Sequence, residues 1–286
     1  MKRHRGVCRV ATVCAAVLLA LGSVQPVAYG ASCVLAWDQI KGFDPEGAPG
    51  DRFGAAVAIS GDTAVIGAPN RDSGKGAAYV YRRVLGRGWL FEQKLTAGDG
   101  VAGNGFAQSV AVSGNTIVIG AHTATTLVGD ETGAAYVFMR SGSAWFEQAK
   151  LVASDGTDYG RFGYSVAVSG QTAVIGESWA NVGSVDWAGA AHVFVRSGDT
   201  WTRQRKLVSP SPAMYEGFGC SVGIWRDTVV VGADSSVVES LAAAGSAYVF
   251  TRSGTTWSTP QRLVAGDSAA GAFFGNAVAI DRDWIV

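Results

Sequence analysis

Short apolar runs separated by two-residue steps that contain glycine recur along most of the chain. In the first full example, the run 53–60 is followed by a Gly-Asp step and then by the run 63–68. Two such β-branched runs around a Gly-first step are typical of a hairpin with a type II′ turn. A second pair, 76–82 and 89–95, predicts a second hairpin, and later copies join this pair through a Ser-Gly turn such as Ser141-Gly142. Each unit is therefore expected to contain four short antiparallel strands.

The four-strand unit repeats with a fixed period of 56 residues (145 − 89 = 56). The aromatic residues that keep this period are Trp89, Trp145, Trp201 and Trp257, and Phe106, Phe162, Phe218 and Phe274. Glycine and aromatic residues that recur once per four-strand unit predict an all-β fold, a β-propeller of four-stranded antiparallel blades. A β-helix would need much shorter rungs, and a sandwich would not repeat its side chains in register.

The blade boundaries follow from the register of the repeats. The predicted blades are 53–97, 106–153, 162–209 and 218–265, with a partial blade at 274–286. Residues 37–42 resemble the start of a fourth strand and are expected to complete the last blade. Because an open ring would leave unpaired sheet edges, we expect the propeller of residues 31–286 to be incomplete at its C-terminus and the natural protein to be longer.

A Phe-Gly opening, first seen at Phe53-Gly54, recurs in register with the repeats, and the first copy ends its second apolar run with Gly67-Ala68-Pro69. They resemble the FG-GAP repeat, the unit of the integrin α-subunit propeller and of many bacterial surface proteins, and the resemblance extends over residues 37–286. The copies depart from the pattern at Ala107, which replaces the opening glycine. Pro69 is replaced in the later copies by His122, Glu177-Ser178 or Asp234. The resemblance implies an adhesion-like scaffold of the short-loop bacterial type.

Integrin-type repeats carry calcium in an acidic loop between the first two strands of a blade, so the resemblance raises the question of a metal. Here that loop is only Gly61-Asp62, Gly114-Asn115 or Gly170-Gln171. One side-chain oxygen per turn cannot supply the six to eight oxygen ligands of calcium. Acids between the units, such as Asp99 and Asp155, are more simply explained as turn formers. We therefore expect no metal and no cofactor.

The charge balance excludes some partners, and the N-terminus indicates a compartment. The net charge is zero and 16% of the residues are charged, so nucleic acid and anionic membranes are not expected as partners. A basic start, the apolar stretch 10–21 and small residues near position 30 predict a signal peptide over residues 1–30 rather than a membrane span. The protein is expected to be secreted or at the cell surface, in a bacterium. Cys33 is lipidated, paired with Cys220, or incidental.

Two motif matches suggest catalysis only superficially. Residues 219–223 fit G-x-S-x-G, but that motif needs a strand–turn–helix context and a histidine partner. Ser221 instead lies in an expected strand and recurs in the other copies. Residues 98–103 fit G-x-G-x-x-G, but no helix follows to receive a phosphate. We expect no enzymatic activity, and His192, which replaces a repeated tyrosine, is expected to be a packed ring.

The connections between the second and third strands, and those between units, vary most among the copies. In a four-stranded meander they emerge on one face, and variable loops on a uniform scaffold are where function usually lies. Trp179 and Trp187, with Asn181 and Asp186 in the same connection, are the best candidates for contacting a protein or glycan ligand. The alternative is that both rings pack over the blade ends.

The repeated tryptophans are expected to be structural, because every unit contains one. The sequence therefore favours an exported, non-enzymatic β-propeller that binds an unknown protein or glycan through its variable loops. Two alternatives remain open: an accessory module of a larger secreted enzyme, and an architectural component of an envelope or matrix.

Overall fold

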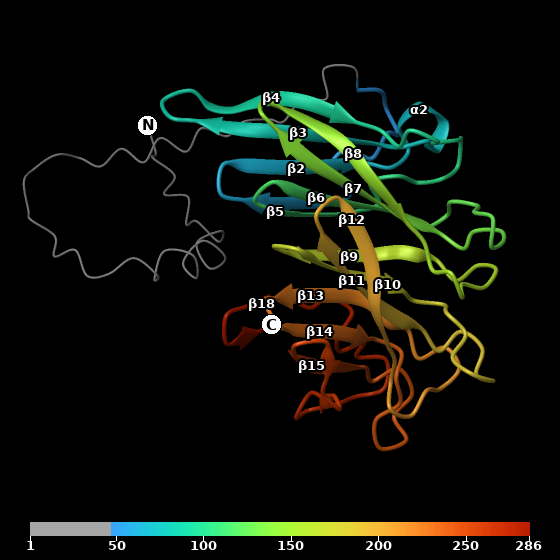
Figure 1. Cartoon of the computed structure of the whole chain (residues 1–286). Coiled ribbons are helices and arrows are strands. Elements are labelled where there is room, and N and C mark those ends of the chain that lie inside the picture. The colour runs from blue at the N-terminus through green and yellow to red at the C-terminus, as the bar shows by residue number, and fades with distance from the viewer. Residues whose placement is uncertain (1–46) are drawn as a thin grey trace, which may run out of the picture. The chain divides into compact units, whose positions relative to one another are not determined.

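The computed structural model describes residues 47–286, which belong to one unit that runs from residue 40 to residue 286. This unit is almost entirely β, with four antiparallel sheets that follow one another along the chain (Figure 1). The predicted signal peptide, Cys33 and the orphan strand 37–42 lie outside the described residues. The predicted fold class, all-β with four-stranded antiparallel blades, is confirmed.

Each sheet is a meander in which strands adjacent in sequence pair with one another. The first sheet contains β1 (Val57–Ser60), β2 (Thr63–Ala68), β3 (Ala77–Val84) and β4 (Gly88–Leu95). The second contains β5 (Ser109–Ser113), β6 (Thr116–Ala121), β7 (Ala134–Ser141) and β8 (Ala144–Leu151). The third contains β9 (Phe162–Ser169), β10 (Thr172–Glu177), β11 (Ala190–Ser197) and β12 (Thr200–Leu207).

The fourth sheet and the last hairpin are less regular. The fourth sheet contains β13 (Phe218–Trp225), β14 (Thr228–Ala233), β15 (Ser246–Ser253), β16 (Thr256–Trp257) and β17 (Gln261–Leu263), and the last hairpin β18 (Ile280–Asp281) and β19 (Trp284–Ile285). Both β16 and β17 pair with β15, so together they replace the single fourth strand of the other sheets. Pro260 lies in the break, where its missing N–H removes a ladder bond.

The tight hairpins have the expected geometry, with one correction. Ser60 pairs with Thr63 around Gly61, whose φ of +57° is the only left-handed angle of that turn, as a type II′ turn requires. The predicted Ser-Gly turn is shifted by one residue, because Ser141 pairs with Ala144 as the last residue of β7. The turn is therefore made by the glycine and the residue after it.

Neighbouring sheets are joined by bonds that repeat with the 56-residue period. The hydroxyl of Ser109 donates to the carbonyl of Gly163 at 2.8 Å, Ser165 to Gly219 at 2.8 Å, and Ser221 to Gly275 at 2.6 Å. Each bond links the first strand of one sheet to the opening of the next sheet. Ser221 of the G-x-S-x-G match therefore has a structural partner inside β13, and the sheets are consecutive blades.

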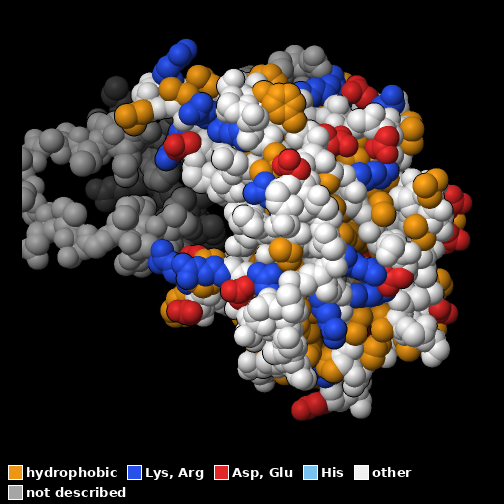
Figure 2. Space-filling model, viewed as in Figure 1, with side chains coloured by type: hydrophobic (Ala, Val, Ile, Leu, Met, Phe, Trp, Pro, Cys, Tyr) orange, Lys and Arg blue, Asp and Glu red, His pale blue; other side chains and the backbone are white. Residues whose placement is uncertain are grey.

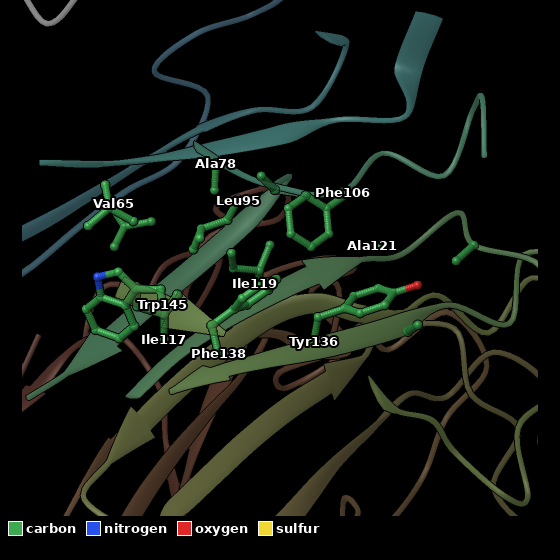
Figure 3. Packing of buried hydrophobic residues seen from close by; sticks show 14 residues of the cluster. Val65, Ala78, Leu95, Phe106, Ile117, Ile119, Ala121, Tyr136, Phe138 and Trp145 are labelled. Carbon is green, nitrogen blue, oxygen red and sulfur yellow. The ribbon is translucent and has the colours of Figure 1, made fainter. Parts of the chain in front are cut away.

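The tryptophans contribute to the same contacts between blades. The indole N–H of Trp201 donates to Gln148 Oε1 at 2.9 Å, and that of Trp257 donates to Gln204 Oε1 at 3.0 Å. Trp145 is buried in a cluster that combines side chains of the first two blades (Figure 3). The interpretation of these residues as packing between blades is confirmed.

The core also repeats around the phenylalanine that opens each blade. Phe106 meets the ring of Tyr136 edge-on at 5.4 Å, and Phe162 meets His192 in the same way at 5.3 Å. The short β-turns lie at one end of the sheets and the long connections at the other (Figure 1). Acidic and basic side chains are interspersed over the face in Figure 2.

Candidate functional site

The long connections between the second and third strands share one backbone in the second, third and fourth blades. Each contains an isolated antiparallel bridge, and the bridges are Thr126–Gly129, Val182–Val185 and Val238–Leu241. Each is closed by a glycine N–H that donates to a carbonyl nine residues earlier, as Gly189 does to Ala180 at 2.9 Å. The sequence predicted a different connection in every copy. The side chains do differ, but the backbone that holds them, with its bridge and its closing glycine bond, is the same in the three blades; we call this backbone the frame.

The first blade departs from this frame. Its connection contains the short turn α2 (Arg71–Gly74), in which Asp72 and Ser73 have left-handed φ angles. Arg71 donates to Asp51 at 2.8 Å, and this buried pair fixes the connection to the start of the blade. The hydrogen bond from Ala48 and the Arg71 guanidinium hold the pKa of Asp51 below its ordinary value.

Two of the four predicted site residues line one pocket. Trp179 and Trp187 border a pocket of about 290 Å³, and their side chains are 40% and 36% exposed. The pocket lies between the third and fourth blades, because its opposite wall contains Tyr215 and Asp234. The rings of Trp187 and Tyr215 contact each other with 5.0 Å between their centroids and a tilt of 34° between their planes.

The other two predicted residues lie beside the pocket. Asn181 Oδ1 accepts a hydrogen bond from the backbone N–H of Trp187 at 3.0 Å, so Asn181 positions that tryptophan. Asp186 is exposed and is not part of the pocket wall. The structure therefore brings the two tryptophans together and gives the two polar residues different surroundings.

Several residues of the pocket were missed by sequence reasoning. Tyr164, Tyr215 and Arg161 come from the openings of blades and the connections between them. The Arg161 guanidinium lies 3.7 Å from the centre of the Trp179 ring, within the range of a cation–π contact. The signal for Tyr164 was its variable position two residues after an opening phenylalanine. Tyr215 carried no comparable signal, because only the fold brings its connection to this pocket.

Cys220 also lines this pocket and is the one cysteine among residues 47–286. Burial, with a further contribution from Asp234, raises the pKa of its thiol to about 11. The thiol is therefore protonated at neutral pH and is a poor nucleophile. The predicted alternatives of lipidation of Cys33 and of its pairing with Cys220 involve a residue outside the described part.

A second pocket of about 430 Å³ adjoins the first, because Arg161 and Tyr164 line both. Its wall also contains Arg52 and His122, and no acidic side chain belongs to it. The His122 ring meets Tyr164 edge-on at 5.5 Å. Burial, followed by the charge of Arg161, lowers the pKa of His122 to about 4, so this imidazole is neutral at neutral pH.

Two further pairs of polar side chains belong to the scaffold. Tyr136 donates to Asp99 at 2.7 Å. In the next blade His192 Nε2 lies 2.7 Å from Glu177 Oε2, and both side chains are fully buried. His192 is thus a packed ring, as expected, with an acidic partner that the sequence did not reveal.

Within residues 47–286, no three histidine, cysteine, aspartate or glutamate side chains come together as metal ligands. The same segment contains no helix with the length and apolar character needed to cross a bilayer.

The family comparison agrees with the repeated geometry. The model of the FG-GAP repeat matches five consecutive segments, 38–81, 89–138, 145–194, 201–250 and 257–286, which together cover most of the chain. Comparison with curated proteins finds no match. The period, the meandering blades and the matched segments together show that the chain belongs to the FG-GAP repeat family.

Proposed function

We propose that this chain is an exported, non-enzymatic β-propeller that binds a protein or glycan ligand in the aromatic pocket between its third and fourth blades. The observation that carries the proposal is the set of partly exposed rings around that pocket, namely Tyr164, Trp179, Trp187 and Tyr215. Large aromatic side chains left open to solvent around a concavity are typical of binding sites, because their burial by a ligand contributes much of the binding free energy.

The loop backbone supports the same proposal. The closed frame around Val182 and Val185 holds both tryptophans, and Asn181 fixes the backbone at Trp187. A site that is rigid before the ligand arrives loses less conformational entropy on binding. A contact surface on a preorganised frame is therefore a better account of these rings than packing over the blade ends.

A non-catalytic role is supported by the groups at the pocket. Its thiol, Cys220, has a raised pKa, and His192 is fully enclosed with Glu177 inside the blade. Nucleophilic catalysis needs an activated nucleophile beside a base, and the pocket wall combines aromatic rings with Arg161, Asp234 and two serines instead. Export is proposed from the predicted signal peptide, and placement at a bacterial surface is proposed from the repeat type.

The test is a binding screen of the full chain against immobilised glycans and surface proteins, followed by variants. We expect Trp187→Ala to lower the affinity for the ligand that the screen finds by at least about tenfold, because the variant lacks the indole ring that the ligand would cover. Phe146→Ala is the matched control, because Phe146 is 58% exposed on β8 and lies outside both pockets. Equal affinity of the wild-type chain and the Trp187 variant, or equal losses in both variants, would overturn the proposal.

A further inference from the structure

We propose that the pocket next to the aromatic one binds the carboxylate of an acidic saccharide, so that the ligand of this face is a uronate-containing glycan. The inference rests on the proposed binding function and names its ligand class. It is carried by Arg52 and Arg161, two arginines at equivalent positions of the repeat that line the same pocket.

The backbone at these arginines is the first observation. The residue before each opening phenylalanine has a left-handed φ, which is +56° at Arg52 and +62° at Arg161. Gly105 and Gly217 hold the equivalent positions in the second and fourth blades, with φ of +61° and +72°. Left-handed backbone is costly for residues with a Cβ atom. Non-glycine residues kept in such a conformation are enriched at functional sites.

The charge of the pocket is the second observation. Neither Arg52 nor Arg161 forms an ion pair with an acidic side chain of residues 47–286, and Arg161 Nε is buried without a hydrogen-bond partner there. His122 Nδ1 is likewise buried and unpartnered among the described residues. A carboxylate would supply the missing acceptor to the guanidinium groups, which recognise planar anions through paired N–H donors.

The adjacency of the pockets is the third observation, and the lining of the aromatic pocket favours a saccharide over an acidic peptide. Arg161 and Tyr164 line both pockets, so an oligosaccharide that contacts these two side chains reaches both pockets. The aromatic pocket combines ring faces with Asp234, Ser178 and Ser235. Ring faces suit the C–H face of a pyranose, while carboxylate and hydroxyl groups suit its hydroxyls.

The experiment is isothermal titration of tetragalacturonate into the full chain, with the fully methyl-esterified tetramer as the matched uncharged ligand. We expect the acid to bind at least about tenfold more tightly than the ester, because the ester has no carboxylate to form a charge-assisted hydrogen bond with the arginines. We also expect the affinity for the acid to fall with added salt.

Three variants separate binding from folding. Arg161→Gly and Arg52→Gly are expected to raise the melting temperature, since glycine accepts a left-handed φ, and to weaken binding of the acid about tenfold or more. Arg87→Gln is the control, because Arg87 is exposed in the turn between β3 and β4 and lies outside both pockets. It removes the same charge and should leave the affinity unchanged.

Each contrary outcome overturns the inference in a recognisable way. If acid and ester bind equally and Trp187→Ala abolishes both, the carboxylate pocket is wrong while the proposed function stands. If tetraglutamate binds as tightly as tetragalacturonate, the saccharide assignment is wrong. If neither tetramer binds, the ligand class is wrong, and the broader screen described above decides the proposed function separately.

Discussion

The second and third blades place different side chains on the same backbone. Both are four-stranded meanders, and both use a serine of the first strand, Ser109 or Ser165, to bond the next blade. Their long connections have the same internal bridge, yet Thr123 and Glu131 of the second blade stand where the third has Trp179 and Trp187. The repeat therefore determines the backbone of these connections, and single positions on it determine which side chains the blades present there.

The two blades also differ inside the scaffold. The second blade pairs Tyr136 with Asp99, whereas the third pairs His192 with Glu177. Glu177 stands at the end of β10, where the second blade has Ala121. Both blades thus have a polar pair at this position, but the acid comes from the turn before the blade in the second blade and from the end of β10 in the third. A substitution on one side of such a pair requires a matching change on the other side, because a buried polar group without a partner is destabilising.

The largest expected effect breaks the pair of the third blade. Glu177→Ala should lower the free energy of unfolding by about 3 kcal/mol, because His192 is left buried without its partner. The double variant Glu177→Ala, His192→Tyr rebuilds the pair of the second blade, since Asp155 stands where that blade has Asp99. We expect it to recover at least half of the loss in urea unfolding. A double variant no more stable than the single one would contradict this account.

The next effect concerns the opening glycine, which the second blade lacks. Gly163 has a φ of +89°, and an added Cβ would lie 2.3 Å from the carbonyl oxygen of Ala134. Gly163→Ala should therefore destabilise the chain by about 2 kcal/mol. Ala107, the equivalent residue, has a φ of +72°. Ala107→Gly should stabilise by about 1 kcal/mol. Thermal unfolding measures both effects: the melting temperature should fall for Gly163→Ala and rise for Ala107→Gly. A shift in the same direction for both variants would contradict the conclusion that the two positions share one backbone conformation.

A smaller effect depends on pH and on His122, which stands where the third blade has Ser178. The pKa of His122 is about 4 in the folded state, against an ordinary 6.5. The unfolded chain therefore binds the proton more tightly, so this contribution to stability is complete above pH 6.5 and declines as the pH falls toward 4. We expect His122→Ser to reduce the loss of stability between pH 7 and 4 by about 1–2 kcal/mol. Identical pH profiles for both proteins would contradict the assignment.

The sequence predicted the features that repeat, because repetition turns single residues into a pattern. Ser221 alone matched a catalytic motif, but its register with Ser109 and Ser165 indicated a strand, and all three bond neighbouring blades. The strand tryptophans were identified as packing residues in the same way.

Features of a single blade were harder to predict. Tyr215 reaches Trp187 only because the chain folds two blades side by side, and nothing in its local sequence indicates that neighbour. The Glu177–His192 pair joins positions 15 residues apart across two strands. The common backbone of the long connections was hidden by their different side chains, because bonds between backbone groups hold it together.

The most direct test of the account exchanges side chains on the shared frame. Residues 178–189 would be replaced by 122–133, a segment of equal length with the same internal bridge. The measurement is isothermal titration of tetragalacturonate into this folded variant. The account predicts a chain that unfolds cooperatively near the wild-type temperature and gives no heat of binding. Wild-type affinity in the exchanged chain would contradict the claim that the third-blade side chains carry the binding site.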